Sequence, residues 1–217
     1  MYIPPAFRIE DKARLAAFLR AHSFATFITQ DGTTPFASHL PMLFRPDLGE
    51  HGTLIAHLAR ANPQWQHFAA GREALAIFHG PHGYISPSWY EAAPAVPTWN
   101  YAVVHAYGIP AIFEDRDRIV SLLRETISFY ESSLEHPWPG ELPPEYLDKM
   151  IRGIVAFEIP LTRLEGKFKL GQNRSAADLQ GVYRALSRST HADDRALAEL
   201  MRNEGHVPDG PQATGIT

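Results

Sequence analysis

Short β-rich runs separated by turn residues extend through most of the chain, and they constrain its fold more than any other feature. The first two runs are joined by Asp31-Gly32, a pair typical of tight hairpins. Short turns can connect only antiparallel neighbours, so the pattern predicts an antiparallel sheet or barrel. The expected strands cover residues 24–29, 33–43, 53–58, 74–79, 101–113 and 154–164.

Amphipathic segments between and after these runs predict helices. Asn62 precedes Pro63, which is the order of an N-cap residue and a first helical residue. Asp115 and Ser175 also precede helical patterns as capping residues. Strands with helices in their connections and at the ends indicate an α+β domain over residues 1–190, followed by a short helix and flexible tail over 191–217. The expected helices cover residues 11–21, 64–70, 115–133, 145–151, 175–188 and 193–202.

Composition excludes several classes of function. The 217-residue chain has no cysteine, which rules out disulfides, thiolate metal sites and a cysteine nucleophile. Its formal net charge of −4 offers no general attraction to nucleic acid, so DNA contact would need a local basic patch. No apolar run approaches the roughly 18 residues of a membrane span, and no secretion signal begins the chain. We therefore expect a cytoplasmic protein without a membrane partner.

Residues 80–101 hold four prolines, two tryptophans, three tyrosines and a histidine. Prolines fix φ and reduce the conformations open to the unfolded chain, while the aromatic rings offer flat faces with polar edges. Two interpretations follow. The segment either forms a rigid platform for a planar ligand or is an aromatic loop that packs on the core.

Three further segments place polar groups near the ends of expected strands. In 35–41, alternation sends Ser38 and His39 to opposite faces. In 56–65, His57 and Arg60 precede a helix start, whose free N–H groups can receive an anion. In 164–174, two lysines share one face before an amide-rich turn; such lysines either are solvated or donate to a ligand. Together the segments favour a planar, phosphorylated ligand over a covalent mechanism.

Five blocks in this order resemble the signature of the PaiB-like family of FMN-binding negative transcriptional regulators: ASHLP, HLARANPQW, GPHGYISPSWY, VPTWNY and EGKFKLGQNR. The resemblance extends from about Ile3 to Arg188. It implies an FMN-binding split β-barrel, antiparallel and Greek-key-like with flanking helices, that forms a homodimer with flavin at the subunit interface. By position, residues after the third strand would hold the phosphate, and the block at 165–174 would reach the same or the partner's flavin.

The expected cofactor is therefore FMN, and we expect neither a metal site nor an identifiable catalytic residue. Segments and resemblance together give one set of expected cofactor-binding residues: Ser38, His39, His57, Leu58, Ala59, Arg60, Asn62, Trp65, Tyr84, Ser86, Trp89, Trp99, Asn100, Lys167, Lys169, Gln172 and Asn173.

The resemblance implies a flavin-dependent sensor or negative transcriptional regulator, with DNA or a regulatory protein as the partner. The helical region 176–202 contains arginines but also acidic residues, so a solvated helical pair is the first interpretation and a DNA-reading element the second. Two alternatives stay open. One is a flavin-dependent oxidoreductase, such as a flavin reductase using NAD(P)H, and the other is a haem-binding split-barrel protein.

Overall fold

The computed structural model describes residues 1–207. Residues 208–217 of the expected flexible tail lie outside the described residues. The chain divides into two compact units. We describe each by itself. Unit 1 comprises residues 1–11, 79–103 and the chain from 165 onward, and unit 2 comprises residues 12–78 and 104–164.

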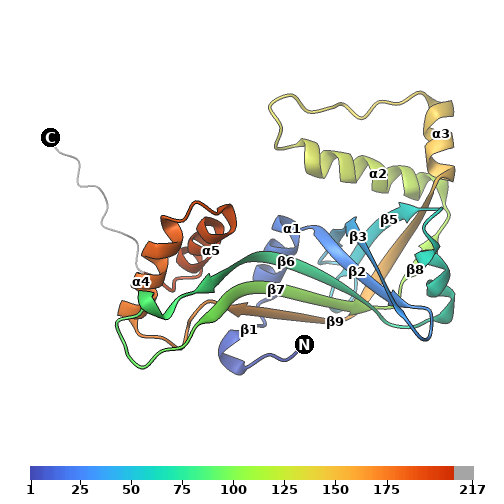
Figure 1. Ribbon diagram of the computed structural model, residues 1–217. Coiled ribbons are helices and arrows are strands. Elements are labelled where there is room, and N and C mark those ends of the chain that lie inside the picture. The colour runs from blue at the N-terminus through green and yellow to red at the C-terminus, as the bar shows by residue number, and fades with distance from the viewer. Residues whose placement is uncertain (208–217) are drawn as a thin grey trace. The chain divides into compact units, whose positions relative to one another are not determined.

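Nine strands of the described chain form one sheet (Figure 1). Seven of them follow the order β3-β2-β6-β7-β9-β5-β4, and β1 and β8 each pair with β9. The pairings of β2 with β3 and β6, and of β5 with β4 and β9, are antiparallel, as the short turns predict. The strands are β1 (Arg8–Ile9), β2 (Phe24–Gln30), β3 (Pro35–Pro41), β4 (Leu43–Arg45), β5 (Thr53–Ala59), β6 (Ala74–Ile85), β7 (Thr98–Gly108), β8 (Ala111–Phe113) and β9 (Ile154–Lys169).

The β2–β3 hairpin confirms the turn predicted at Asp31-Gly32. Gln30 pairs with Pro35, and Gly32 takes a φ of 122° in the connection. The Asp31 carboxylate accepts hydrogen bonds from the backbone N–H groups of Thr34 and Thr33, which lowers its pKa to about 2. The run predicted as one strand over 33–43 is two strands, because the chain leaves β3 after Pro41 and resumes at Leu43.

The helices lie close to their predicted ranges, with one difference in type. The segment after Asn62 is a 3-10 helix, capped by the Asn62 side chain and ended by Gly71 at a φ of 60°. Asp115 and Ser175 cap their helices as predicted. The helices are η1 (Pro5–Phe7), α1 (Lys12–Ala21), η2 (Pro63–Ala70), η3 (Pro87–Trp89), α2 (Arg116–Glu131), α3 (Pro144–Arg152), α4 (Ala176–Ser187) and α5 (Ala192–Asn203).

Strands β6 and β9 are longer than predicted, and β6 changes its buried face along its length. In β6, Ala74 and Phe78 are buried at even positions, whereas Gly83 and Ile85 are buried at odd positions. The change falls between Phe78 and His79, where the chain passes from unit 2 to unit 1. A period-two pattern is interrupted at such a point, so the sequence pattern ends although the strand continues.

Each unit has its own apolar core. In unit 2 the rings of Phe27 and Phe157 stack with centroids 5.4 Å apart, and Phe68 lies 5.0 Å from Phe157. In unit 1, α4 and α5 bury Leu186 and Leu197 completely. The two cores hold the strand ends and turns that carry the expected site residues.

Candidate functional site

The expected site residues form two groups, one in each unit. Unit 2 holds the group around the β5–η2 turn, and unit 1 holds the group around β7 and the end of β9. The first group is Ser38, His39, His57, Leu58, Ala59, Arg60, Asn62 and Trp65; the second is Tyr84, Ser86, Trp89, Trp99, Asn100, Lys167, Lys169, Gln172 and Asn173.

The β5–η2 turn is held by a continuous set of hydrogen bonds. The backbone N–H of Arg60 donates to Gly153 O at 2.8 Å, and that of Asn62 donates to Ala59 O at 2.9 Å. The Asn62 carboxamide accepts the Gln64 N–H at 3.0 Å. At the helix start, the N–H groups of Asn62 and Gln64 are therefore not free for an anion, because the chain already binds them.

Arg60 is the cation of this turn. Its Nε donates to Arg152 O at 3.0 Å and its Nη2 to Ile154 O at 2.9 Å. These bonds fix the orientation of the guanidinium, whereas Nη1 has no hydrogen-bond partner among residues 1–207. The Trp65 indole N–H donates to Arg60 O at 3.0 Å. The turn thus presents one oriented, exposed donor nitrogen with a full positive charge.

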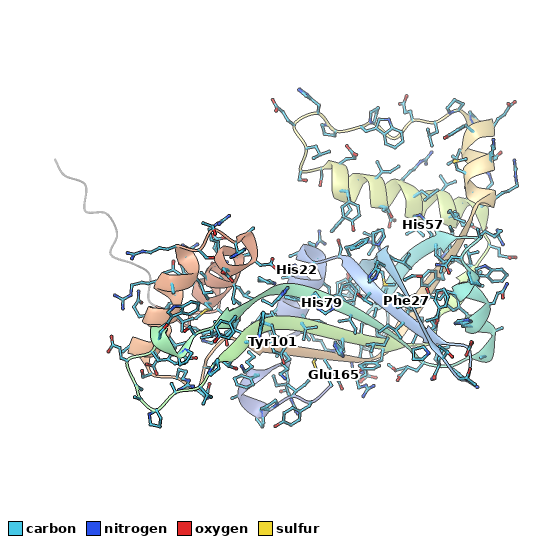
Figure 2. All side chains as sticks on the ribbon, viewed as in Figure 1. His22, Phe27, His57, His79, Tyr101 and Glu165 are labelled. Atoms are coloured by element: carbon cyan, nitrogen blue, oxygen red, sulfur yellow. The ribbon has the colours of Figure 1, made fainter. Side chains whose placement is uncertain are left out.

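Three neighbours of Arg60 play different roles. His57 is half-buried on β5 (Figure 2), and burial lowers the pKa of its imidazole. The ring is therefore neutral near pH 7. The Leu58 side chain is 2% exposed and belongs to the core, so only its backbone can serve a ligand. Ala59 ends the ladder of β5 by pairing with Ile154.

Ser38 and His39 lie on opposite faces of β3, as the alternation predicts. The Asn62 Nδ2 donates to Ser38 Oγ at 2.8 Å, which ties β3 to the turn. His39 is exposed on the other face, with its Nδ1 3.3 Å from Thr26 Oγ1. Of the two, only Ser38 therefore contacts the β5–η2 turn.

Sequence reasoning missed Gln64, the buried polar residue beneath this turn. Its side chain is fully buried, and its Nε2 donates to Phe27 O at 3.0 Å and Phe36 O at 3.2 Å. Its Oε1 is buried without a hydrogen-bond partner in the described chain. Gln64 thus joins η2 to β2 and β3, and no local sequence motif predicts this role.

The exposure of two aromatic residues of unit 1 favours one of the two interpretations of residues 80–101. Trp99 is 54% exposed and Tyr84 is 47% exposed, which excludes both from the core. Their rings meet edge to face at 6.1 Å, and His82 stacks against Trp99 at 6.3 Å. This group forms an exposed aromatic surface on β6 and β7, the arrangement expected of a platform.

The two lysines of β9 share a face, as predicted, but Lys167 is not solvated. Its side chain is 8% exposed, its ammonium donates to Tyr2 O at 3.1 Å, and it lies 5.2 Å from the centre of the Tyr101 ring. Lys169 donates to Thr98 Oγ1 at 2.6 Å and to the carbonyl of Trp99. Burial, reinforced by the charge of Lys167, lowers the pKa of Lys169.

Of the remaining predicted residues of unit 1, Gln172 stabilises the chain after β9. Gln172 folds back, accepting the Leu170 N–H at 2.8 Å and donating to Phe168 O. Asn100 is 3% exposed, and Asn173 is exposed. Ser86 caps η3 by accepting the Ser88 N–H at 3.2 Å, and Trp89 is half-buried in η3.

Asp178 organises the proline-rich loop, a role that the sequence pattern did not predict. Its carboxylate is 2% exposed and accepts the N–H groups of Glu91 at 2.8 Å and Ala92 at 3.1 Å. The bond from Ala92 is the main cause that lowers its pKa. The Arg174 guanidinium lies 4.3 Å from the centre of the Tyr90 ring. Helix α4 thus fixes the loop that precedes β7.

Residues 1–207 contain no group of three His, Cys, Asp or Glu side chains able to hold a metal ion. No helix in that part of the chain is long and apolar enough to cross a membrane.

Residues 1–163 match the family model described as "Putative FMN-binding domain". Over 94% of this chain and 98% of the relative, the sequence is 35% identical to protease synthase and sporulation protein PAI 2 of Bacillus subtilis. The chain therefore belongs to this family of FMN-binding domains and is a homologue of PAI 2. Lys167, Lys169, Gln172 and Asn173 lie beyond the residues that the family model matches.

Solved structures support the fold. The FAD and haem binding protein of Mycobacterium smegmatis matches with a TM-score of 0.57 at 16% identity, over 80% of this chain and 78% of that one. The flavocytochrome Anf3 of Azotobacter vinelandii matches with a TM-score of 0.55 at 13% identity, over 75% and 69%. The predicted α+β split-barrel fold is confirmed, and so is FMN as the cofactor of the family.

Proposed function

We propose that this protein is a homodimeric, FMN-dependent sensor that regulates transcription, and that the β5–η2 turn binds the FMN phosphate. The observation that carries the proposal is the Arg60 guanidinium, which two backbone carbonyls orient while Nη1 stays exposed. A phosphate accepts strong charge-assisted hydrogen bonds from such a donor. Because the orientation is fixed before binding, little side-chain entropy is lost when the anion arrives.

The donor set of each unit fits a part of this cofactor. In unit 2, a cation, a neutral imidazole at His57 and the carboxamide of Asn62 suit a phosphate and its ribityl hydroxyls. In unit 1, the exposed rings of Trp99 and Tyr84 suit a flat ring system. Bound FMN would supply reversible hydride or electron transfer, while these residues would bind and orient it.

The residues proposed to contact flavin are those of the two groups already named, with Leu58 contributing its backbone alone and with Lys167 stabilising the fold rather than the ligand. A homodimer with flavin at the subunit interface would let the Lys169 segment of one chain serve the flavin held by its partner. Within residues 1–207, three of the arginines on α4 and α5 engage neighbouring groups: Arg184 with Gln180 O, Arg195 with Ser189 O, and Arg202 with Glu199. These contacts favour regulation through a protein partner over direct reading of DNA by this helical pair.

A fluorescence-quenching titration with FMN and with riboflavin tests the proposal. The two ligands share the ring and the ribityl chain, so their difference isolates the phosphate. We expect FMN to bind at least about 10-fold more tightly, which corresponds to about 1.4 kcal/mol. Equal affinities would contradict a phosphate site, and absence of binding by both would contradict the flavin function.

Regulation and turnover need separate measurements on the FMN-loaded protein. We expect sedimentation to show a dimer, and NAD(P)H oxidation to stay at the rate of free FMN. Oxidation well above that rate would identify a flavin reductase instead of a sensor. Operator binding that persists at moderate salt would establish direct repression, since non-specific phosphate attraction weakens steeply with salt.

A further inference from the structure

A cavity lies in unit 2, and its lining includes no residue of the two groups expected to bind flavin. It has a volume of about 870 Å³ and is bounded by α2, by α3 and by the connection between them. Figure 1 shows this connection as a long loop that leaves the end of α2 and arches to α3. The volume falls in the range of small-molecule sites, about 300–1,000 Å³. We call residues 132–143 the strap.

The walls of the cavity are apolar and incompletely packed. Leu123 and Ile127 of α2 face Leu147 and Met150 of α3 across it, and Trp138 lines it from the strap. Trp138 is 44% exposed and Met150 is 38% exposed, so neither residue is fully covered by the described chain. Helix α3 itself buries no residue fully. An apolar ligand would cover surface that the fold leaves in water.

One end of the cavity carries a cation without a partner in the part of the chain that the structure describes. Arg116 and Arg118 of α2 are ion-paired with Asp148 and Glu158. Arg124, on the same helix, lines the cavity and makes no hydrogen bond or ion pair within residues 1–207. A carboxylate could accept two parallel hydrogen bonds from this guanidinium.

The other end is negative. Glu131 is the last residue of α2, where the helix dipole already favours a cation. Its Oε2 accepts a hydrogen bond from the backbone N–H of Trp138 at 2.7 Å, which ties the strap to the carboxylate. Glu141 of the strap adds a second carboxylate to the lining. The Trp138 ring and these carboxylates are the groups that receive an ammonium ion.

The spacing of the two ends selects the length of a ligand. Arg124 and Glu131 are seven residues apart on α2, which corresponds to about 10.5 Å along the axis. Three residues of extended peptide span about 10 Å. From this geometry we propose that the cavity binds a short apolar peptide with free termini, its carboxylate at Arg124 and its ammonium at Glu131.

Calorimetric titration of the FMN-loaded full-length protein with trileucine tests the proposal, with the N-acetylated and C-amidated forms as probes. We expect free trileucine to bind, and each blocked form to bind at least about 10-fold more weakly, because each lacks one charge-assisted contact. Binding of trileucine should also change the fluorescence of Trp138, and Trp138→Phe should remove that change. No binding of trileucine at millimolar concentration, or equal binding of all three forms, would overturn the proposal.

Two charge-neutralising variants assign the ends. Arg124→Gln should abolish the preference for a free carboxylate and leave the preference for a free amine, whereas Glu131→Gln should do the reverse. Glu131→Gln keeps an acceptor for Trp138 N–H, so the strap stays attached. Arg188→Gln and Glu114→Gln, at exposed positions outside the cavity, control for net charge.

FMN affinity should not change in any of these variants, so failure of this proposal is separable from failure of the flavin function. A variant pair that leaves both preferences intact would overturn it. Dimerisation that protects Trp138 from quenching and excludes trileucine would also overturn it, in favour of a second copy of the chain as the occupant.

Discussion

The two basic regions of the molecule use their cations in opposite ways. Arg60 in unit 2 is exposed, with two donor nitrogens on backbone carbonyls and a third without a partner among residues 1–207. Lys167 in unit 1 is buried, with its ammonium on Tyr2 O and near the Tyr101 ring. In the sequence both are basic residues beside a strand end. The comparison shows that residue type indicates which contacts a side chain can make. Burial then determines whether it makes them with the rest of the protein or with a ligand.

Lys167→Ala should give the largest effect in this comparison, and the effect should be on folding. The variant removes a charge-assisted hydrogen bond and the packing of the buried stem, for an expected loss of about 3 kcal/mol in the free energy of unfolding. Urea denaturation measures it. Lys149→Ala on α3 is the exposed control and should change stability little. A stable Lys167→Ala protein that had lost FMN binding would instead make Lys167 a ligand contact.

Arg60→Ala should act on FMN binding. We expect FMN affinity to fall by about 1.5–3 kcal/mol, the value of a hydrogen bond to a charged group, while riboflavin affinity changes little. The paired titration measures the difference, and Arg72→Ala serves as an exposed arginine control. If FMN and riboflavin weaken equally, the variant has disturbed the turn through its bonds to Arg152 O and Ile154 O. An unchanged FMN dissociation constant would remove Arg60 from the site.

Matched glycine substitutions test whether the two units are equally intolerant of added volume. A Cβ at Gly181 in unit 1 would lie 2.1 Å from Trp89 O, and one at Gly108 in unit 2 would lie 2.4 Å from Pro160 O. We expect each alanine variant to lose about 1–3 kcal/mol of stability in thermal or urea unfolding. Gly153→Ala, whose Cβ would lie 3.2 Å from Met150 O, should cost less. Equal tolerance of all three would contradict these close approaches.

The pH dependence of stability in acid tests the comparison with one carboxylate in each unit. Hydrogen bonds from the backbone lower the pKa of Asp31 in unit 2 to about 2 and lower the pKa of Asp178 in unit 1. Each group therefore stabilises the fold above its unfolded pKa of about 4, and this stability is lost as the pH falls toward the folded pKa. Melting temperatures between pH 5 and 2 should decline less steeply in Asp31→Asn and Asp178→Asn. Slopes identical to that of the unsubstituted protein would contradict the assignment.

Much of the fold could be predicted because its signals are local. Asp115, Ser175 and Asn62 cap the helices that they were expected to cap, and the β2–β3 hairpin follows its turn residues. The continuation of β6 beyond His79 could not be predicted, since its buried face changes and the alternation is lost. The 3-10 geometry of η2 could not be predicted either, because an N-cap residue followed by proline is found at the start of both α and 3-10 helices.

The site was predicted by residue but not by contact. Ser38 and Asn62 were expected near the β5–η2 turn, and they share a hydrogen bond of 2.8 Å. The clamp of Asp178 on Glu91 and Ala92 spans more than 80 positions of sequence and has no local pattern. The cavity beside α2 was missed for the same reason, because it is bounded by the arch of the strap rather than by a motif.

The sequence by itself determined the antiparallel α+β architecture, the caps, the absence of thiol chemistry and membership of the FMN-binding family, because each depends on residue type and short-range order. Only the tertiary structure decided that Trp99 and Tyr84 are exposed, that Lys167 is buried and that Arg60 binds two carbonyls. These properties depend on which distant segments approach one another. Burial and hydrogen-bond satisfaction are properties of that approach, since the same side chain exchanges water for protein only after the chain has folded.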